Sequence, residues 1–154
     1  MKLRDILRES SVIADIKGKL KKEILFELVE PLRKSNLIHD ADAAVEIIME
    51  REKLGSTGIG DGVAIPHGKM KNIDTVLCTV GLSRQGVDFD AVDSRPVHIF
   101  FLVLAPEDSA SLHLKVLSRI SKILRDQSFR KKMLKLTDAH GIYTNVIEAD
   151  DKLS

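Results

Sequence analysis

The sequence predicts an α/β fold in which helices pack around a mixed β-sheet. Two nearly apolar runs, residues 75–82 and 98–105, have the composition of strands, and turn-forming residues follow each of them. The second run has almost no polar position, as expected for a central strand covered on both faces. Segments with helical periodicity precede and follow these runs, and such an alternation is typical of an α/β sandwich. We expect a single domain spanning residues 1–154, because no repeat, low-complexity tract or linker rich in proline and serine divides the chain.

Two helices are expected before the first strand. Residues 18–33 place leucine and isoleucine side chains at four-residue spacing and contain a proline near the end. Residues 41–52 form the second helix, with Asp40 or Asp42 as its N-cap. The apolar stripe of this helix, continued by three or four residues, arrives at Arg51. This arginine therefore either points toward a site or extends from the helix end into solvent.

The region between the second helix and the first strand is expected to be a loop. Residues 54–69 contain five glycines, and the short apolar stretch 63–65 interrupts them. After the first strand, the residues RQG at 84–86 predict a turn that leads toward the second strand. Three helices follow: residues 109–125, which are apolar around much of the circumference, a short basic helix capped by Asp126 or Ser128 and ending near Leu136, and residues 138–148.

Charge and composition limit the classes of function. The chain has 24 basic and 23 acidic residues and a net charge of +1, which argues against a general nucleic-acid binder. Its longest apolar run, residues 97–105, is too short for a membrane-spanning helix, and the N-terminal residues have no apolar stretch like that of a signal peptide. With one cysteine, Cys78, no internal disulfide can form, and this residue is expected to be a buried small hydrophobe. We therefore expect a cytoplasmic protein without membrane insertion.

Among the five histidines, His67 has the sequence context of a reactive group. Pro66 fixes its own φ and favours an extended Ile65, while Gly68 removes side-chain bulk beside the ring. The glycines upstream can direct backbone N–H groups into a concavity that suits an anion. Neutral imidazole is a good nucleophile near neutral pH, so a positioned histidine beside an anion-binding loop suits phosphoryl chemistry. The alternative at this point is a turn histidine in a glycine-rich connection.

A second histidine, His113, falls in the first turns of the helix predicted over residues 109–125. The N-terminal end of a helix dipole favours anions and disfavours imidazolium, so this ring could donate a hydrogen bond to a phosphoryl oxygen. A helix histidine whose hydrogen bonds are satisfied within the protein is the alternative. His39 and His140 are expected in solvent, and His98 is expected at the edge of a buried strand.

Other chemistries find little support in the residue spacing. Residues 62–69 depart from a P-loop, because five residues separate the two glycines and Met70 replaces the hydroxyl residue that binds magnesium. Neither a metal-ligand motif such as HExxH nor a serine-hydrolase elbow occurs. A zinc site built from His67, His113 and Asp61 stays an open alternative.

The stretch REKLGSTGIG, from Arg51 to Gly60, and the following VAIPHG at 63–68 closely resemble the active-site signature of IIA proteins. These proteins belong to the fructose–mannitol class of the bacterial phosphoenolpyruvate-dependent phosphotransferase system (PTS). The resemblance covers nearly the whole chain, and it implies a mixed β-sheet flanked by helices on both faces. It also implies that His67 accepts a phosphoryl group on Nε2 from an HPr-like phosphocarrier protein, with no metal or organic cofactor.

By the same resemblance, Arg51 and His113 are the supporting residues of the site. Backbone N–H and hydroxyl groups of the loop at Ser56, Thr57 and Gly58 would bind the phosphoryl oxygens. Asp61, at a position that varies in the family, is assigned at most a role at the rim.

The resemblance leaves two branches open. A nitrogen-regulatory IIA protein controls partner proteins according to its phosphorylation state, and the wording REKLGSTGIGDGVAIPHGK at 51–69 favours this branch. A sugar-specific IIA protein instead passes the phosphoryl group to a separate IIB domain during sugar transport. A phosphoester hydrolase that uses His67 and His113 as an acid–base pair is a third hypothesis. The basic run from Arg119 to Lys135 either is a solvated face or docks an acidic partner.

Overall fold

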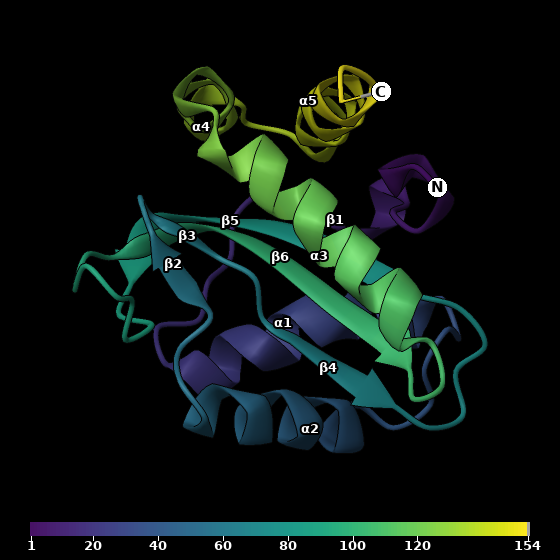
Figure 1. Ribbon diagram of the computed structural model, residues 1–154. Helices are drawn as coiled ribbons and strands as arrows, with labels where there is room; N and C mark the ends of the chain where they lie inside the picture. The colour runs from purple at the N-terminus through teal and green to yellow at the C-terminus, as the bar shows by residue number, and fades with distance from the viewer. Residues whose placement is uncertain (154) are drawn as a thin grey trace.

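A six-stranded mixed sheet lies between two layers of helices (Figure 1). This computed structural model describes residues 1–153. The strands are β1 (Val12–Ile13), β2 (Gly58–Gly60), β3 (Val63–Ala64), β4 (His67–Met70), β5 (Leu77–Val87) and β6 (Val97–Pro106). Their order is β1-β5-β6-β3-β2, and β4 also pairs with β6. The structure thus confirms the predicted fold class.

The longest strands, β5 and β6, form the antiparallel centre of the sheet. Two short strands pair in parallel with β6: β3 near its start, where Val63 lies opposite Ile99, and β4 near its end, where His67 lies opposite Val103. On the other side, β1 pairs in parallel with β5. The start of β4 is therefore fixed directly against the central strand of the sheet.

The helices divide between the two faces of the sheet (Figure 1). One face is covered by α1 (Lys21–Lys34) and α2 (Ala41–Lys53), and the other by α3 (Ala110–Arg125), α4 (Gln127–Lys135) and α5 (Ala139–Asp151). Two 3₁₀ turns, Leu3–Asp5 and Glu9–Ser11, precede β1. Within residues 1–153, no helix combines the length and the apolar composition that crossing a lipid bilayer requires.

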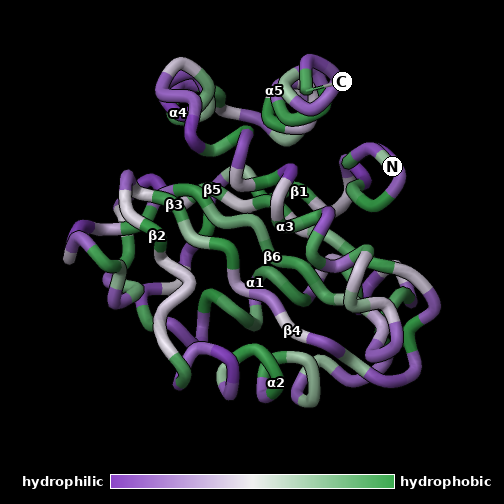
Figure 2. The backbone as a smooth tube through the Cα atoms, viewed as in Figure 1, coloured by the Kyte–Doolittle hydropathy of each residue, from purple (hydrophilic) through white to green (hydrophobic). Residues whose placement is uncertain are grey.

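Alternation along β6 explains why its sequence is almost continuously apolar. Ile99, Phe101 and Val103 belong to the core beneath α3, α4 and α5. Phe100 and Leu102 belong to the core beneath α1 and α2. Figure 2 shows hydrophobic stretches concentrated along the sheet, with hydrophilic residues on the outer turns of the helices. Because both faces are buried, neither set of positions can be polar without a partner.

The predicted helices are confirmed to within a few residues. Asp40 caps α2 by accepting a hydrogen bond from the Ala43 N–H at 3.0 Å, and Asp126 caps α4 by accepting one from the Ser128 N–H at 2.9 Å. These are two of the capping residues that the sequence offered.

The turn predicted at residues 84–86 is wrong, because β5 runs through this segment to Val87. Gly86 adopts a φ of 80°, and the register between β5 and β6 shifts there, so the strand bends without ending. The Arg84 guanidinium donates to the carbonyls of Ala14 and Leu134, each at 3.1 Å, and holds the strand to its neighbours. The connection to β6 instead spans residues 88–96.

The loop predicted at residues 54–69 is wrong in part, because it contains β2, β3 and β4. The first two strands form a hairpin, and β3 and β4 both pair with residues of β6 that lie 36 positions further along the chain, as Val63 with Ile99 and His67 with Val103. Glycine-rich composition predicts bending, but it carries no information about such distant pairing. The brief strand β1 and the two 3₁₀ turns were not predicted either, since they are too short for a periodic pattern.

Candidate active site

His67 is the first residue of β4, beside the central strand. The Val103 N–H of β6 donates to the Pro66 carbonyl at 2.9 Å and fixes the backbone just before the histidine. His67 Nδ1 lies 2.8 Å from the Ile65 carbonyl oxygen. A carbonyl oxygen can only accept, so Nδ1 holds the ring proton and donates it. The half-buried ring therefore presents Nε2 with its lone pair, and the resemblance predicts that this nitrogen is the nucleophile.

Gly68 allows α2 to approach β4 closely. A Cβ at this position would lie 2.6 Å from Ile47 Cγ2, a distance that real Cβ atoms do not show, so a larger residue would push the helix away. The close approach brings the last turn of α2, which carries Arg51, toward His67. Gly68 and His67 line the same hollow, in agreement with the expected loss of bulk beside the ring, and the missing side chain also permits this helix packing.

Arg51 is half-buried, and its Nη1 donates to the Gly55 carbonyl at 2.9 Å. A guanidinium has five N–H donors, so most of them stay available to an anion. The pKa of His67 is lowered mainly by burial and further by the positive charge of Arg51, while the Ile65 hydrogen bond and the Glu52 carboxylate oppose this shift. The net effect favours the neutral, nucleophilic ring.

His113 lies in the first turns of α3, with only 5% of its surface exposed. Its ring centroid is 5.5 Å from that of His67, and the two ring planes meet at 75°. Within residues 1–153, His113 Nε2 is buried and has no hydrogen-bond partner. Burial, followed by the charges of His67 and Lys69, lowers the pKa of His113 to about 4. Both imidazoles are therefore neutral near pH 7. The buried Nε2 of His113, which lies close to the His67 ring, is available to form a hydrogen bond with a bound group.

Acidification is expected to destabilise the fold through His113. Its pKa falls from about 6.5 in the unfolded chain to about 4 in the folded protein, so its contribution to stability is complete above pH 6.5 and is lost as the pH falls toward 4. We expect this group to account for a loss of about 2–3 kcal/mol between about pH 7.5 and about pH 4.5. Urea unfolding of the wild type and of a His113→Gln variant across this range measures the effect. Equal losses in the two proteins would contradict the assignment.

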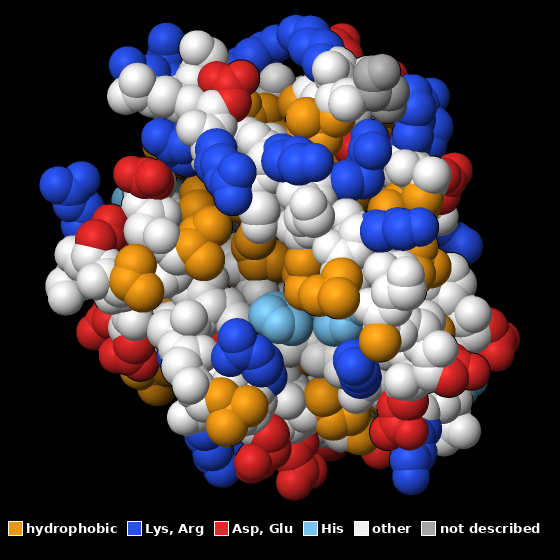
Figure 3. Space-filling view, in the orientation of Figure 1, with side chains coloured by type: hydrophobic (Ala, Val, Ile, Leu, Met, Phe, Trp, Pro, Cys, Tyr) orange, Lys and Arg blue, Asp and Glu red, His pale blue; other side chains and the backbone are white. Residues whose placement is uncertain are grey.

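Arg51, His67 and His113 line one hollow of about 620 Å³ between α2, β4 and α3. Figure 3 shows histidine side chains at this surface, between basic side chains on one side and hydrophobic side chains on the other. Lys69 also lines the hollow, because it lies two residues after His67 in β4 and so on the same face of the strand. Lys69 was not predicted as a site residue because residues 54–69 were expected to be a loop, and side chains two residues apart share a face only in a strand. Glu50 and Gly68 also line the hollow, together with apolar side chains: Ile47, Leu54, Ala110, Leu114 and Leu117.

The predicted phosphate-binding residues Ser56, Thr57 and Gly58 do not line this hollow. The Thr57 N–H lies 3.2 and 3.3 Å from the Glu52 carboxylate oxygens, and the Thr57 hydroxyl donates to the same carboxylate. The Ser56 hydroxyl donates to the Phe89 carbonyl at 2.6 Å and accepts the Gly58 N–H at 3.0 Å. These donors hold the loop in shape, and contact with phosphoryl oxygens would require their release. That contact stays a prediction.

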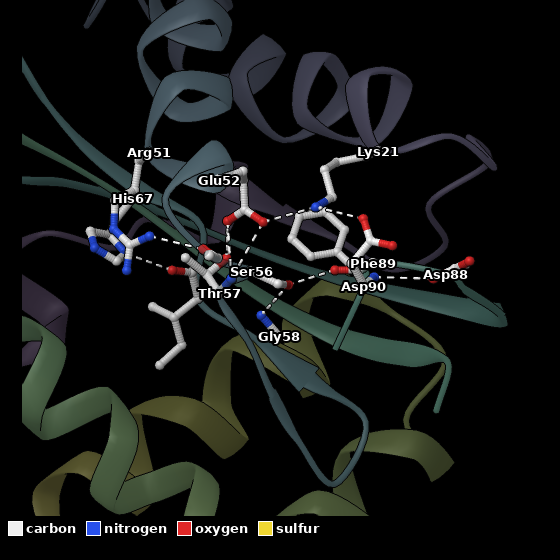
Figure 4. Close-up of polar contacts among 12 residues, drawn as sticks. Lys21, Arg51, Glu52, Ser56, Thr57, Gly58, His67, Asp88, Phe89 and Asp90 are labelled. Carbon is white, nitrogen blue, oxygen red and sulfur yellow. Dashed lines mark hydrogen bonds and ion pairs between the residues drawn. The ribbon is translucent and has the colours of Figure 1, made fainter. Parts of the chain in front are cut away.

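Glu52, for which the sequence predicted no role, organises this loop (Figure 4). The Glu52 side chain is only 2% exposed, and its carboxylate pairs with Lys21 Nζ of α1 at 3.1 Å. Lys21 Nζ also lies 3.3 Å from the Asp90 carboxylate and 4.6 Å from the centre of the Phe89 ring. Glu52 thereby joins α1, α2 and the loop behind Arg51. Lys21 is 31 residues away, so no local pattern predicts this pairing.

The remaining predicted residues lie outside the hollow. Asp61 is exposed in the turn between β2 and β3, and its N–H donates to the Asp93 carboxylate at 3.0 Å. It does not join His67 and His113, and residues 1–153 contain no group of three or more metal-ligating side chains arranged for a metal ion. His98 contacts the Ser83 carbonyl at 2.8 Å, His140 pairs with Glu9 at 2.7 Å, and His39 is exposed.

Comparison with known proteins identifies the family. The family described as "Phosphoenolpyruvate-dependent sugar phosphotransferase system, EIIA 2" matches residues 5–149. The chain belongs to this family. The resemblance based on REKLGSTGIG and VAIPHG is therefore confirmed.

Two nitrogen regulatory proteins are among the similar proteins. The nitrogen regulatory protein of Bradyrhizobium diazoefficiens is 37% identical over 145 residues, which cover 94% of each chain. The crystal structure of the nitrogen regulatory protein IIA-Ntr from Neisseria meningitidis is 33% identical, with a TM-score of 0.86 and coverage of 94% of this chain and 98% of that one. These matches support the nitrogen-regulatory branch of the fructose–mannitol class.

A sugar-specific protein is also similar. The fructose-specific EIIABC component of Bacillus subtilis is 34% identical over 152 residues. The match covers 99% of this chain but 24% of that protein, so the chain spans about a quarter of its length.

Proposed function

We propose that this chain is a phosphocarrier of the phosphotransferase system, in which His67 Nε2 accepts a phosphoryl group from an HPr-type donor. The main support is the hydrogen bond from His67 Nδ1 to the Ile65 carbonyl at 2.8 Å, because it leaves Nε2 unprotonated. The position of Arg51 and His113 on the same hollow adds to this support. Family membership is consistent with the same reaction class.

In the proposed step, the donor phosphohistidine enters the hollow with its phosphorus in line with His67 Nε2. The Nε2 lone pair forms the new P–N bond as the donor P–N bond breaks, and the bonding electrons return to the donor ring. The transferring group spreads negative charge over its equatorial oxygens. This negative charge can be stabilised by Arg51, Lys69 and an N–H of His113. Charge-assisted contacts of this kind contribute about 1.5–3 kcal/mol each.

Phosphorylation with purified components tests the proposal. We expect label from phosphoenolpyruvate, passed through enzyme I and HPr, to enter the wild-type chain stoichiometrically. The label should be lost in acid and retained in base, as the P–N bond of phosphohistidine requires. Failure to acquire label, or a label that survives acid, would overturn the proposal.

We further propose that the phosphorylated and unphosphorylated forms regulate partner proteins. The nitrogen regulatory proteins of Bradyrhizobium diazoefficiens and Neisseria meningitidis match this chain over nearly their full length at 37% and 33% identity, which favours regulation over sugar uptake. In the sugar-specific alternative, a IIB domain accepts the phosphoryl group from His67. Adding purified fructose- and mannitol-type IIB domains to the labelled chain separates the two: retained label supports regulation, and rapid transfer to a IIB domain supports the alternative.

A further inference from the structure

A strongly basic region lies on the helix layer formed by α3, α4 and α5, away from the histidines. Between Arg119 and Lys135 the chain has seven basic residues and one acidic residue, a local charge of +6 in a chain whose net charge is +1. The rest of the molecule is therefore acidic overall. Figure 3 shows basic side chains gathered over this helix layer, in the upper part of the view.

Among the contacts within residues 1–153, two of these seven side chains support the fold through polar groups. Arg119 pairs with the buried Asp150 at 2.8 Å, and Arg130 donates to the Leu124 carbonyl at 2.7 Å. The other five are exposed and form no ion pair within residues 1–153: Lys122, Arg125, Lys131, Lys132 and Lys135. Like charges three and four residues apart on a helix disfavour it, so the fold gains nothing from this clustering.

A small hollow lies among these charges. It measures about 230 Å³, and Lys122 of α3, Lys132 of α4 and Lys152 after α5 contribute to its lining. Its apolar lining comes from Ile123, Phe129, Ala149 and Leu153.

Asn145 of α5 lines the same hollow and is only 6% exposed. Within residues 1–153, its Nδ2 is buried and has no hydrogen-bond partner. Two carboxylates, Asp126 and Glu148, also line the hollow, but Asp126 is occupied in capping α4. The hollow therefore offers several donors, few available acceptors and an apolar surface.

We propose that this face binds an acidic segment of a partner protein, with one apolar side chain in the hollow and carboxylates on the surrounding lysines. Carboxylates supply the acceptors that the lysines and Asn145 lack, and charge complementarity of this kind directs partner choice. A nucleic-acid backbone fits less well, because it offers no aliphatic side chain for the apolar part of the hollow at Ile123 and Phe129. Lys122 lies nine residues after His113 on α3, about 14 Å along the helix axis. The segment could therefore bind while the hollow at His67 stays open.

Binding of a designed peptide tests this inference. The probe is a labelled twelve-residue peptide with glutamates on both sides of one central leucine, followed by fluorescence anisotropy. We expect the variant Lys122→Glu/Lys131→Glu/Lys132→Glu to bind at least tenfold more weakly than wild type. The matched control Lys19→Glu/Lys22→Glu/Lys34→Glu, which alters exposed lysines at α1 on the opposite layer, should change binding less than twofold. Equal weakening in both variants would show mere net-charge attraction and would overturn the proposal.

Further measurements locate the peptide-binding site and identify the chemical class of the partner. The side-chain amide resonances of Asn145 should shift on peptide addition, and a peptide with glutamine in place of glutamate should not bind. An unshifted Asn145, binding of the glutamine peptide, or tighter binding of duplex DNA or anionic lipid vesicles would each contradict an acidic protein segment. Circular dichroism melting checks that the variants fold. If the triple variant does not fold, the single variant Lys132→Gln is used instead and should also weaken peptide binding. None of these measurements depends on phosphorylation of His67.

Discussion

A His67→Ala variant is expected to acquire no label from phospho-HPr under conditions that label the wild type fully. The replacement removes His67 Nε2, the ring nitrogen that keeps a lone pair because Nδ1 donates its proton to the Ile65 carbonyl. His113 lines the same hollow, but its Nε2 is buried, so we do not expect it to accept the phosphoryl group in place of His67. Gel-based quantification of the incorporated label over time measures the loss.

Matched variants distinguish this effect from general damage. His39→Ala and His140→Ala alter exposed imidazoles and should be labelled at the wild-type rate. Arg51→Ala should be labelled slowly with the fold intact, by a factor of about 10–100, because it removes one charge-assisted contact. Full labelling of the His67→Ala protein would end the phosphocarrier assignment.

Replacing Glu52 with alanine is expected to lower the free energy of unfolding by about 3 kcal/mol. The change removes the buried partner of Lys21, which keeps the exposed Asp90 carboxylate, and it removes the acceptor for the Thr57 N–H and hydroxyl. Breaking a buried pair by deleting one member is costly, because the remaining charge and donors lose their compensation. Urea unfolding at neutral pH measures the loss of stability.

A neighbouring glutamate provides the control. Glu50 pairs with Lys53 at 2.7 Å, but both side chains are more than 60% exposed, and solvent screens such pairs. Glu50→Ala should therefore change stability by less than about 0.5 kcal/mol. Glu52→Gln keeps an acceptor for Thr57 and should fall between the two variants. Similar stabilities for Glu52→Ala and Glu50→Ala would show that the buried pair does not support the loop.

The sequence predicted the parts of the fold that depend on local patterns. The helix caps at Asp40 and Asp126 and the near-continuous apolar strand at 98–105 are confirmed, because propensity and burial agree there. The turn expected at 84–86 failed because distant carbonyls hold Arg84 and keep β5 extended. No rule based on neighbouring residues includes such contacts.

In the candidate site, too, some features were predicted from the sequence and others depend on contacts between distant residues. His67, Arg51 and His113 share one hollow, as the resemblance implied. The donors of Thr57 and Ser56 were expected to face an anion, but Glu52 and the Phe89 carbonyl already accept from them. The Thr57 donors depend on the buried Glu52 carboxylate and the Ser56 hydroxyl on a carbonyl 33 residues away, and no local sequence pattern predicts either pairing. Lys69 was not predicted as a site residue, because its position on the same face as His67 depends on residues 67–70 forming a strand paired with β6.

The carbonyl behind the imidazole has a consequence for the phosphorylated form. In the proposed reaction, a phosphoryl group on Nε2 leaves the proton on Nδ1, so the modified ring carries positive charge. The Ile65 oxygen, 2.8 Å from that nitrogen, would stabilise this charge and so make the imidazole a poorer leaving group. One main-chain oxygen would thereby help to set the group-transfer potential of the phosphoprotein, and with it how long a signal persists after the donor has departed.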